Sequence, residues 1–179
     1  MARRGRRGPL VEDGAGEHRP PEPEADPYSV ARAIVLRKLT AAPRTRAQLA
    51  DDLVQRDVPD EVATRVLDRF TEVGLVDDEA FAQTWVRTRH LGRGLARRAL
   101  AAELRQRGVA DETVAEAIEA VSPDDERASA VELVDRRLAA TRGLPRETRI
   151  RRLTGLLARK GYSGGLAMAV VRDALDNEV

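Results

Sequence analysis

The sequence predicts an all-α protein, an elongated array of three tandem three-helix repeats that follows a disordered N-terminal tail. Only five of the 179 residues are aromatic, and Ala, Leu, Arg and Glu dominate while alternating β-branched residues are rare. From Ser29 onward the apolar residues recur about every 3.6 positions, the period of a helix. The chain also aligns with itself at two offsets, which indicates internal repeats.

Residues 1–27 have four arginines within the first seven positions, followed by a mixture rich in Gly, Pro and Glu with almost no apolar side chains. Such a composition predicts a disordered tail. Its arginines, Arg3, Arg4, Arg6 and Arg7, are either a contact for nucleic acid or a solvated segment without a dedicated role.

The first repeat begins with a helix that Ser29 caps and that ends near Ala41. Thr45 and Gln48 have the spacing of a capping box, which opens a second helix. A Pro-Asp pair opens a third helix over 59–74, and the glycine at its end favours termination there.

The second repeat begins at Asp77, which caps a fourth helix ending at the Gly-Arg-Gly break over 92–94. Helices near 95–107 and 111–121 follow. In the third repeat, Ser122 before a proline marks the seventh start, the Leu-Pro pair at 144–145 the eighth, and Ser163 the ninth. The predicted segments are a tail over 1–27 and repeats over 28–76, 77–122 and 123–179.

The repeats align at offsets of 51 and 53 residues. Four columns define the second helix of each repeat: Leu49, Leu100 and Leu153; Leu53, Leu104 and Leu157; Arg56, Arg107 and Lys160; Val58, Val109 and Tyr162. Between the last two columns lie Asp57, Gly108 and Gly161. Glycine favours the left-handed conformation that ends many helices, and Asp tolerates it less well. The leucine columns predict core and carry no information about chemistry.

Charge alternates along the chain although the formal net charge is only +1. Residues 28–50 carry +5, 51–79 carry −7, 80–107 carry +6, 108–135 carry −8 and 136–160 carry +8. The basic blocks coincide with the first two helices of each repeat, so stacking the repeats collects positive charge along one side.

The candidate binding residues come from the second and third basic blocks. They are Arg87, Arg89, Arg93, Arg97, Arg98, Arg105, Arg107, Arg149, Arg151, Arg152, Arg159 and Lys160. Two interpretations stay open: a solvated face that pairs with the acidic helices, or an electrostatic surface for a phosphate backbone or an acidic protein.

No pattern indicates catalysis or a metal or cofactor site. Cysteine is absent, and neither His18 nor His90 has neighbours suited to a triad or a metal. The acidic run 77–79 is typical of a helix start, and the 92–94 break lacks the ending of a phosphate-binding loop. The longest apolar run, 166–171, is too short to cross a bilayer, and no signal peptide is apparent, so we expect a cytoplasmic protein.

Residues 74–89 and their continuation over 92–109 resemble the signature of the bacterial RecX family of regulatory proteins. The shared pattern is an acidic helix start, aromatic residues four apart at Phe81 and Trp85, Arg-x-Arg, a glycine-containing break, and an Leu-Arg-x-Arg-Gly-Val helix end. The resemblance extends over about residues 28–177. At helical spacing, Phe81 and Trp85 are interpreted as core rather than as base-stacking residues.

The resemblance implies a non-enzymatic modulator that lies in the groove of the RecA recombinase filament on single-stranded DNA. Because the sequence offers no obvious dimerisation element, we expect a monomer. The resemblance further implies restraint of RecA's ATPase, strand-exchange and co-protease activities in recombination, DNA repair and the SOS response, with some members also binding DNA, including possible double-stranded DNA. Two alternatives stay open: a helix-turn-helix transcription regulator and a solenoid scaffold that binds only protein.

Overall fold

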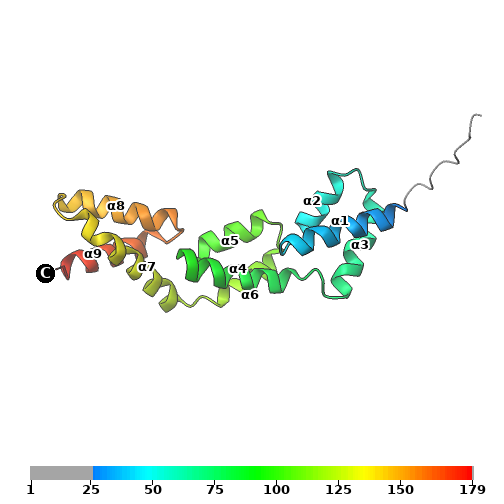
Figure 1. Cartoon of the computed structure of the whole chain (residues 1–179). Coiled ribbons are helices and arrows are strands. Elements are labelled where there is room, and N and C mark those ends of the chain that lie inside the picture. Colours follow the sequence, from blue (N-terminus) through cyan, green and yellow to red (C-terminus); the bar gives the residue numbers. More distant parts are fainter. Residues whose placement is uncertain (1–25, 179) are drawn as a thin grey trace, which may run out of the picture.

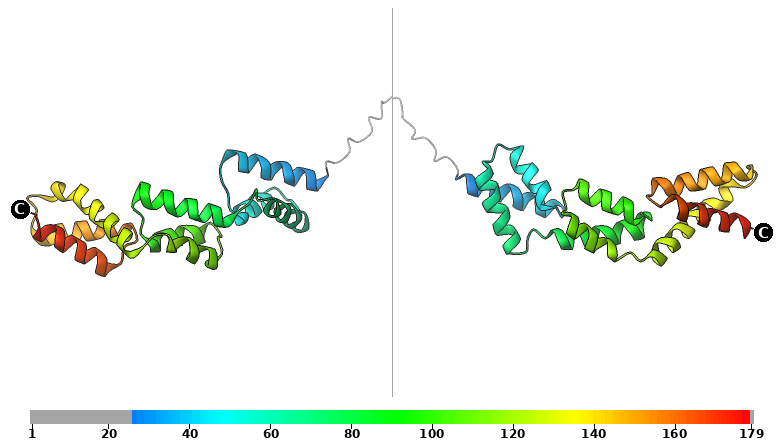
Figure 2. Two further views of the ribbon diagram at one scale, coloured as in Figure 1. Left: turned by 90° about the horizontal axis from the view of Figure 1, so that it is seen from below. Right: turned by 180° about the vertical axis from the view of Figure 1, so that it is seen from behind.

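The computed structural model describes residues 26–178, and this part of the chain contains nine α-helices, one 3-10 turn and no strands. The helices form three successive groups of three along an elongated array (Figures 1 and 2). Their bounds are α1 Pro27–Ala41, α2 Arg46–Val54, α3 Asp60–Glu72, α4 Asp78–Arg93, α5 Arg97–Gln106, α6 Asp111–Glu119, α7 Pro123–Leu138, α8 Arg146–Arg159 and α9 Gly164–Asp176. This confirms the predicted fold class, while the predicted tail lies largely in residues 1–25, outside the described part.

Helix α1 begins two residues before Ser29, so the prediction that Ser29 caps it was wrong. Asp26 is the cap, and its carboxylate accepts hydrogen bonds from the backbone N–H groups of Tyr28 (3.3 Å) and Ser29 (3.2 Å). Pro27 occupies the first helical position, where its fixed φ and missing N–H are no disadvantage. A charged Asp cap also complements the helix dipole, and the hydrogen bond from the Ser29 hydroxyl holds the pKa of Asp26 below its usual value.

The other side-chain caps were predicted correctly. Thr45 forms a capping box with Gln48, Asp77 accepts from the Ala80 N–H at 2.8 Å, and Ser163 caps α9. Ser122 pairs with Asp125 in a second capping box, and the Ser122 hydroxyl lowers the pKa of that carboxyl. The sequence did not predict the 3-10 turn Ala139–Thr141 that follows α7.

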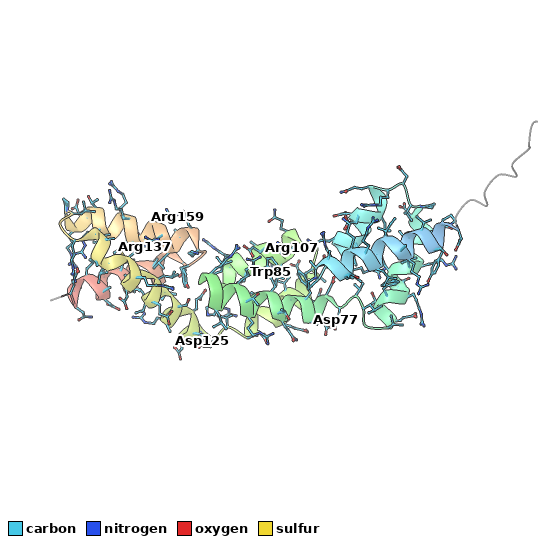
Figure 3. The ribbon with its side chains drawn as sticks, viewed as in Figure 1. Asp77, Trp85, Arg107, Asp125, Arg137 and Arg159 are labelled. Carbon is cyan, nitrogen blue, oxygen red and sulfur yellow. The ribbon has the colours of Figure 1, made fainter. Side chains whose placement is uncertain are left out.

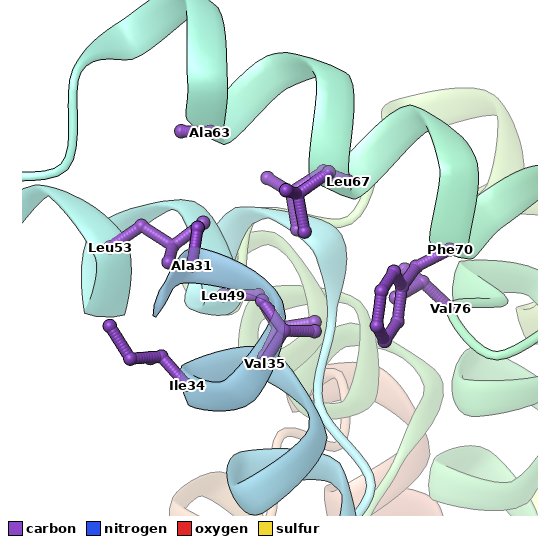
Figure 4. Packing of buried hydrophobic residues seen from close by; sticks show 10 residues of the cluster. Ala31, Ile34, Val35, Leu49, Leu53, Ala63, Leu67, Phe70 and Val76 are labelled. Carbon is purple, nitrogen blue, oxygen red and sulfur yellow. The ribbon is translucent and has the colours of Figure 1, made fainter. Parts of the chain in front are cut away.

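Each repeat has a hydrophobic core of its own. In repeat 1 (α1 to α3), Ala31, Ile34 and Val35 of α1 meet Leu49 and Leu53 of α2 beneath α3 (Figure 4). The cores of repeat 2 (α4 to α6) and repeat 3 (α7 to α9) use the aligned leucines in the same way. All six of these column leucines are at most 2% exposed. Replacing any one by Ala removes about 2–5 kcal/mol of stability.

The second helices α2, α5 and α8 end in the same way. A backbone N–H just beyond each helix donates to the carbonyl five positions earlier: Val58 to Leu53, Val109 to Leu104 and Tyr162 to Leu157, all at 3.2 Å. The residue before each donor is left-handed, with φ of 56° at Asp57, 75° at Gly108 and 90° at Gly161. Asp57 therefore adopts the conformation of its glycine counterparts.

The two glycines serve a second purpose that Asp57 does not share, because the repeats touch at these positions. A Cβ on Gly108 would lie 2.3 Å from the Cβ of Ala47 at the start of α2, and a Cβ on Gly161 would lie 2.6 Å from that of Ala99 at the start of α5. The C-terminus of each second helix thus abuts the N-terminus of the preceding one. No repeat precedes α2 in the described chain, so Asp57 meets no such restriction.

Hydrogen bonds reinforce both joints. The Thr45 hydroxyl donates to the Arg107 carbonyl at 2.6 Å, and the Ala96 N–H donates to the Lys160 carbonyl at 2.9 Å. At the second joint the Tyr162 hydroxyl also donates to the Gly94 carbonyl at 3.1 Å, and burial raises the pKa of the phenol. Helices α2, α5 and α8 consequently follow one another along the same edge of the array (Figure 1).

Backbone N–H groups at the starts of α2 and α5 donate hydrogen bonds to carboxylates of the next repeat. Asp78 accepts from the Arg46 N–H at 2.8 Å, and Glu126 accepts from the Arg97 N–H at 2.9 Å. Negative charge at a helix N-terminus is favourable, so these contacts orient each repeat relative to the one before it. No helix among residues 26–178 is long and apolar enough to span a membrane.

Candidate functional site

The edge formed by α5 and α8 carries most of the exposed candidate arginines. The exposed candidate arginines on these two helices are Arg98, Arg105, Arg151, Arg152 and Arg159. Arg107 and Arg159 mark this edge in Figure 3, in repeats 2 and 3 respectively. The joint between α5 and α8 brings the two basic blocks into one surface, called here the basic edge.

Ion pairs divide the candidates into two groups. Arg105 pairs with Asp111 at 2.6 Å, and Arg149 is half-buried and pairs with Glu178. Hydrogen bonds from Arg142 and Arg149 hold the pKa of Glu178 below its usual range. For Arg105 and Arg149, the interpretation of a solvated face that pairs with acidic residues of the same chain applies.

Seven other candidate arginines have neither an ion pair nor a cation–π contact with any residue of the described chain. They are Arg87, Arg93, Arg97, Arg98, Arg151, Arg152 and Arg159. Lys160, in contrast, forms a hydrogen bond within the array: its ammonium group donates to the Arg93 carbonyl at 2.8 Å across the joint between repeats 2 and 3. Four of the seven, Arg98, Arg151, Arg152 and Arg159, lie on the basic edge, where no carboxylate among residues 26–178 forms an ion pair with them.

Two further candidates surround the single tryptophan. The guanidinium carbons of Arg89 and Arg107 lie 4.1 and 3.8 Å from the centroid of the Trp85 ring. Phe81 stacks on the same ring at 5.7 Å with an interplanar angle of 16°, and the indole N–H donates to Glu103 at 2.8 Å. Cation–π contacts of this kind stabilise by about 0.5–2 kcal/mol each.

The expectation that Phe81 and Trp85 are core is confirmed only in part. Both are half-buried and pack against the core of repeat 2 without being enclosed by it. The ring of Trp85 is already covered by Phe81 and by two guanidinium groups. The residue therefore offers no open face on which a nucleic-acid base could stack.

A cluster of opposite charges in repeat 1 was missed from the sequence. The Asp52 carboxylate, whose side chain is only 10% exposed, lies 2.5 Å from the Lys38 ammonium, 3.7 Å from Arg44 and 3.9 Å from Arg56. The 51-residue offset maps Lys38 and Asp52 onto Arg89 and Glu103, which approach to 4.0 Å in repeat 2. Applying the repeat alignment to charged positions as well as apolar ones would have pointed to this cluster.

The acidic run 77–79 is explained by helix starts, as predicted. Asp77 caps α4, and Asp78 accepts from the start of α2. His90 lies beside the α4 terminus with its Nδ1 2.9 Å from the Leu95 carbonyl, whereas His18 falls outside the described residues. Within residues 26–178 no group of three or more His, Asp or Glu side chains could hold a metal ion.

Comparisons with known proteins agree with this architecture. Three family models match in order: the first three-helix domain of RecX over residues 31–70, the second over 77–118 and the third over 124–171. The chain is 61% identical over 166 residues to the regulatory protein RecX of Thermobifida fusca, covering 91% of this chain and 90% of that one. It is 57% identical over 157 residues to the regulatory protein RecX of Streptomyces lividans, covering 88% and 84%.

Solved structures show the same fold. The crystal structure of RecX from Lactobacillus salivarius superimposes with a TM-score of 0.76 at 18% identity, covering 83% of this chain and 97% of that one. A second RecX crystal structure gives a TM-score of 0.75 at 24% identity, covering 83% and 74%.

Proposed function

Since the chain belongs to the RecX family, we propose that it is a non-enzymatic modulator of the RecA recombinase. In this proposal it binds RecA filaments on single-stranded DNA, lies in their helical groove and restrains ATP hydrolysis, strand exchange and co-protease activity. These effects place it in recombination, DNA repair and the SOS response in the cytoplasm, where it acts as a monomer.

The observation that carries the proposal is the end-to-end alignment of α5 and α8, which unites two basic blocks along one edge. Because four arginines on this edge have no ion pair in the described chain, their charge is available to an external anion. A nucleoprotein filament presents negative charge at regular intervals over a long distance, and an elongated array can contact several intervals at once. Arginine suits such contacts because its planar guanidinium can hold a phosphate through two hydrogen bonds.

Within this proposal the candidate residues have different roles. Arg98, Arg151, Arg152 and Arg159 contact phosphates of the filament DNA from the basic edge. Arg87, Arg93 and Arg97 add positive charge near the joint between repeats 2 and 3. Arg89, Arg105, Arg107, Arg149 and Lys160 chiefly organise the array, because each is engaged by a ring, a carboxylate or a backbone carbonyl.

The test is DNA-dependent ATP hydrolysis by RecA with the protein titrated in at low stoichiometry. We expect the hydrolysis rate to fall well before the protein equals RecA in concentration, because one array covers several filament subunits. An unchanged rate and unchanged filament length at saturation would contradict the proposal.

Binding to random single-stranded and double-stranded DNA across a salt series separates the alternatives. Backbone contact predicts a steep salt dependence with little sequence preference. Strong selection of one short duplex would instead support a sequence-specific regulator.

A further inference from the structure

The two contacts between neighbouring repeats are not held equally firmly. Joint 1 is the contact between repeats 1 and 2, and joint 2 is the contact between repeats 2 and 3. Both have the close approach at a glycine and the carboxylate that accepts a hydrogen bond from the start of a second helix. The remaining contacts differ between the joints, and they determine how far each pair of repeats can move.

Joint 2 is held by three further hydrogen bonds. The Ala96 N–H donates to the Lys160 carbonyl at 2.9 Å, and the Lys160 ammonium group donates to the Arg93 carbonyl at 2.8 Å. The Tyr162 hydroxyl donates to the Gly94 carbonyl at 3.1 Å, and this tyrosine is only 1% exposed. Breaking a buried hydrogen bond leaves its polar groups unpaired in the interior, which is costly. Repeats 2 and 3 are therefore fixed to each other.

In the described part of the chain, joint 1 has a single hydrogen bond in place of these three. The Thr45 hydroxyl donates to the Arg107 carbonyl at 2.6 Å. Val109 stands at the position of Tyr162 and has no side-chain donor. Arg107 stands at the position of Lys160, but its guanidinium group lies on the Trp85 ring of its own repeat. The side chains that link repeat 3 to repeat 2 thus have no counterpart between repeats 2 and 1.

The residue that enters each joint from the start of a second helix also differs. Ala96 is fully buried and belongs to the hydrophobic core of repeat 3, although it lies in repeat 2. Its counterpart in repeat 1 is Thr45, which is buried as well but meets repeat 2 through a polar hydrogen bond. Separating repeats 2 and 3 therefore opens a shared apolar core.

The connecting segments differ in the residue after the helix cap. In both, a buried valine closes the core of one repeat and the next residue caps the following helix: Val76 and Asp77 at joint 1, Val121 and Ser122 at joint 2. At joint 2 the cap is followed by Pro123, whose ring fixes its own φ and restricts the residue before it. At joint 1 the cap is followed by Asp78, so the backbone lacks this restriction.

Space for movement is present beside both joints. Hollows of about 390 and 460 Å³ border joint 1, and a hollow of about 670 Å³ borders joint 2. The free volume therefore allows bending at either joint, and the contacts decide which one bends.

We propose that the array bends at joint 1, while repeats 2 and 3 move as one body. The pivot is the place where Thr45 meets Arg107 and where Ala47 meets Gly108. Because α5 and α8 both belong to the larger body, the basic edge keeps its shape while repeat 1 changes direction. The inference concerns the free chain and does not depend on the proposed function.

The test measures distances between pairs of spin labels on the full chain, which contains no cysteine of its own. The labelled sites are Glu61, Glu112 and Gly165, each the exposed second residue of the third helix of its repeat. A Cβ at Gly165 would meet no atom within 4 Å. Glu61→Cys with Glu112→Cys reports on joint 1, and Glu112→Cys with Gly165→Cys reports on joint 2. The distances are measured by double electron–electron resonance.

We expect the distance distribution across joint 1 to be about twice as broad as that across joint 2, because a hinge concentrates rotation in a few residues between rigid bodies. One label is shared and the three sites are equivalent helix positions, so the labels themselves contribute equally to both widths. Equal widths, or a broader distribution across joint 2, overturn the inference.

A second comparison tests whether the named contacts hold joint 2. Tyr162→Phe together with Lys160→Met removes two of its hydrogen bonds and keeps most of the apolar side-chain volume. We expect this variant to broaden the distribution across joint 2 and to leave that across joint 1 unchanged. Arg172→Met, at an exposed position on α9, is the control and should change neither distribution.

An unchanged width across joint 2 in the Tyr162→Phe, Lys160→Met variant would also overturn the inference, because these contacts would then not fix repeat 3 to repeat 2. Circular dichroism shows whether the variant keeps the helix content of the unaltered chain. If the variant fails to fold, the comparison of the two joints in the otherwise unaltered chain decides the matter by itself.

Discussion

The contact between Gly108 and Ala47 tests whether glycine is required at the joint between repeats 1 and 2. In Gly108→Ala the new Cβ lies 2.3 Å from the Ala47 Cβ, whereas the next nearest atom, the Ala47 Cα, is 3.8 Å away. Carbon atoms prefer about 3.5–4.0 Å, so the whole collision involves one methyl group. Removing that methyl by Ala47→Gly should therefore relieve it.

The cost of Gly108→Ala has two parts. Placing a side chain on a residue with a φ of +75° costs about 1–2 kcal/mol, and the overlap with Ala47 adds about 1–3 kcal/mol. Ala47→Gly alone costs about 0.5–1 kcal/mol because glycine weakens a helix. If the overlap vanishes, the double variant is more stable than the sum of the single variants predicts by about 1–3 kcal/mol.

The assay is urea unfolding of the unaltered chain, both single variants and the double variant. Gly74→Ala is the control for backbone strain, because Gly74 has a φ of +71° and a Cβ at this position would meet no atom within 4 Å. Hydrogen exchange of α2 and α5 accompanies the urea curves, since neighbouring repeats can unfold separately. Additive effects within about 0.5 kcal/mol, or equal losses in Gly108→Ala and Gly74→Ala, would refute the reasoning.

Three further predictions concern other parts of the array. Tyr162→Phe leaves a buried carbonyl of repeat 2 without its donor and should cost about 1–3 kcal/mol, seen as a lower urea midpoint; an unchanged midpoint would contradict this role. Because its pKa is lowered in the folded state, the Glu178 carboxylate stabilises the fold above about pH 4.3, the ordinary pKa of Glu. This contribution is lost as the pH falls through the lowered folded-state value. Protection of the amides at the end of α9, measured against the exchange rate of an unstructured chain at the same pH, should therefore fall on acidification, and unchanged protection would disprove the prediction. The double variant Arg98→Glu, Arg151→Glu should bind single-stranded DNA more weakly. The slope of log affinity against log salt concentration should become shallower by about 0.7 for each phosphate that is no longer neutralised. Arg172→Glu, at an exposed position on α9, should have little effect, and equal weakening by both variants would remove the basic edge from the proposal.

The helical array was predictable because its determinants are local or repeated. The apolar period gives the helices, and caps such as Thr45 and Asp77 place their starts. The aligned leucines identify one core per repeat. The start of α1 was missed because Asp26 and Ser29, three residues apart, are both suitable caps. The choice between them depends on the preference of Pro27 for the first helical turn.

The partners of the charged side chains were less predictable. Periodicity shows that Arg89 and Arg107 avoid the core, yet it does not show that both reach the ring of Trp85 from two different parts of repeat 2. That arrangement depends on how α4 and α5 are rotated against each other. The pairing of Lys38 with Asp52 likewise requires the packing of α1 on α2, which a helical period leaves undefined.

Asp57 makes the end of α2 different from the ends of α5 and α8 as a place where another helix could abut. Each joint is heterologous, since the end of one second helix abuts the start of another, and contacts of that type generate open-ended polymers when they repeat between molecules. A second copy adding its α8 start to the end of α2 would need the close approach that Gly108 and Gly161 permit, and the side chain of Asp57 obstructs it. The end of α2 therefore lacks the glycine that the geometry of the two joints requires.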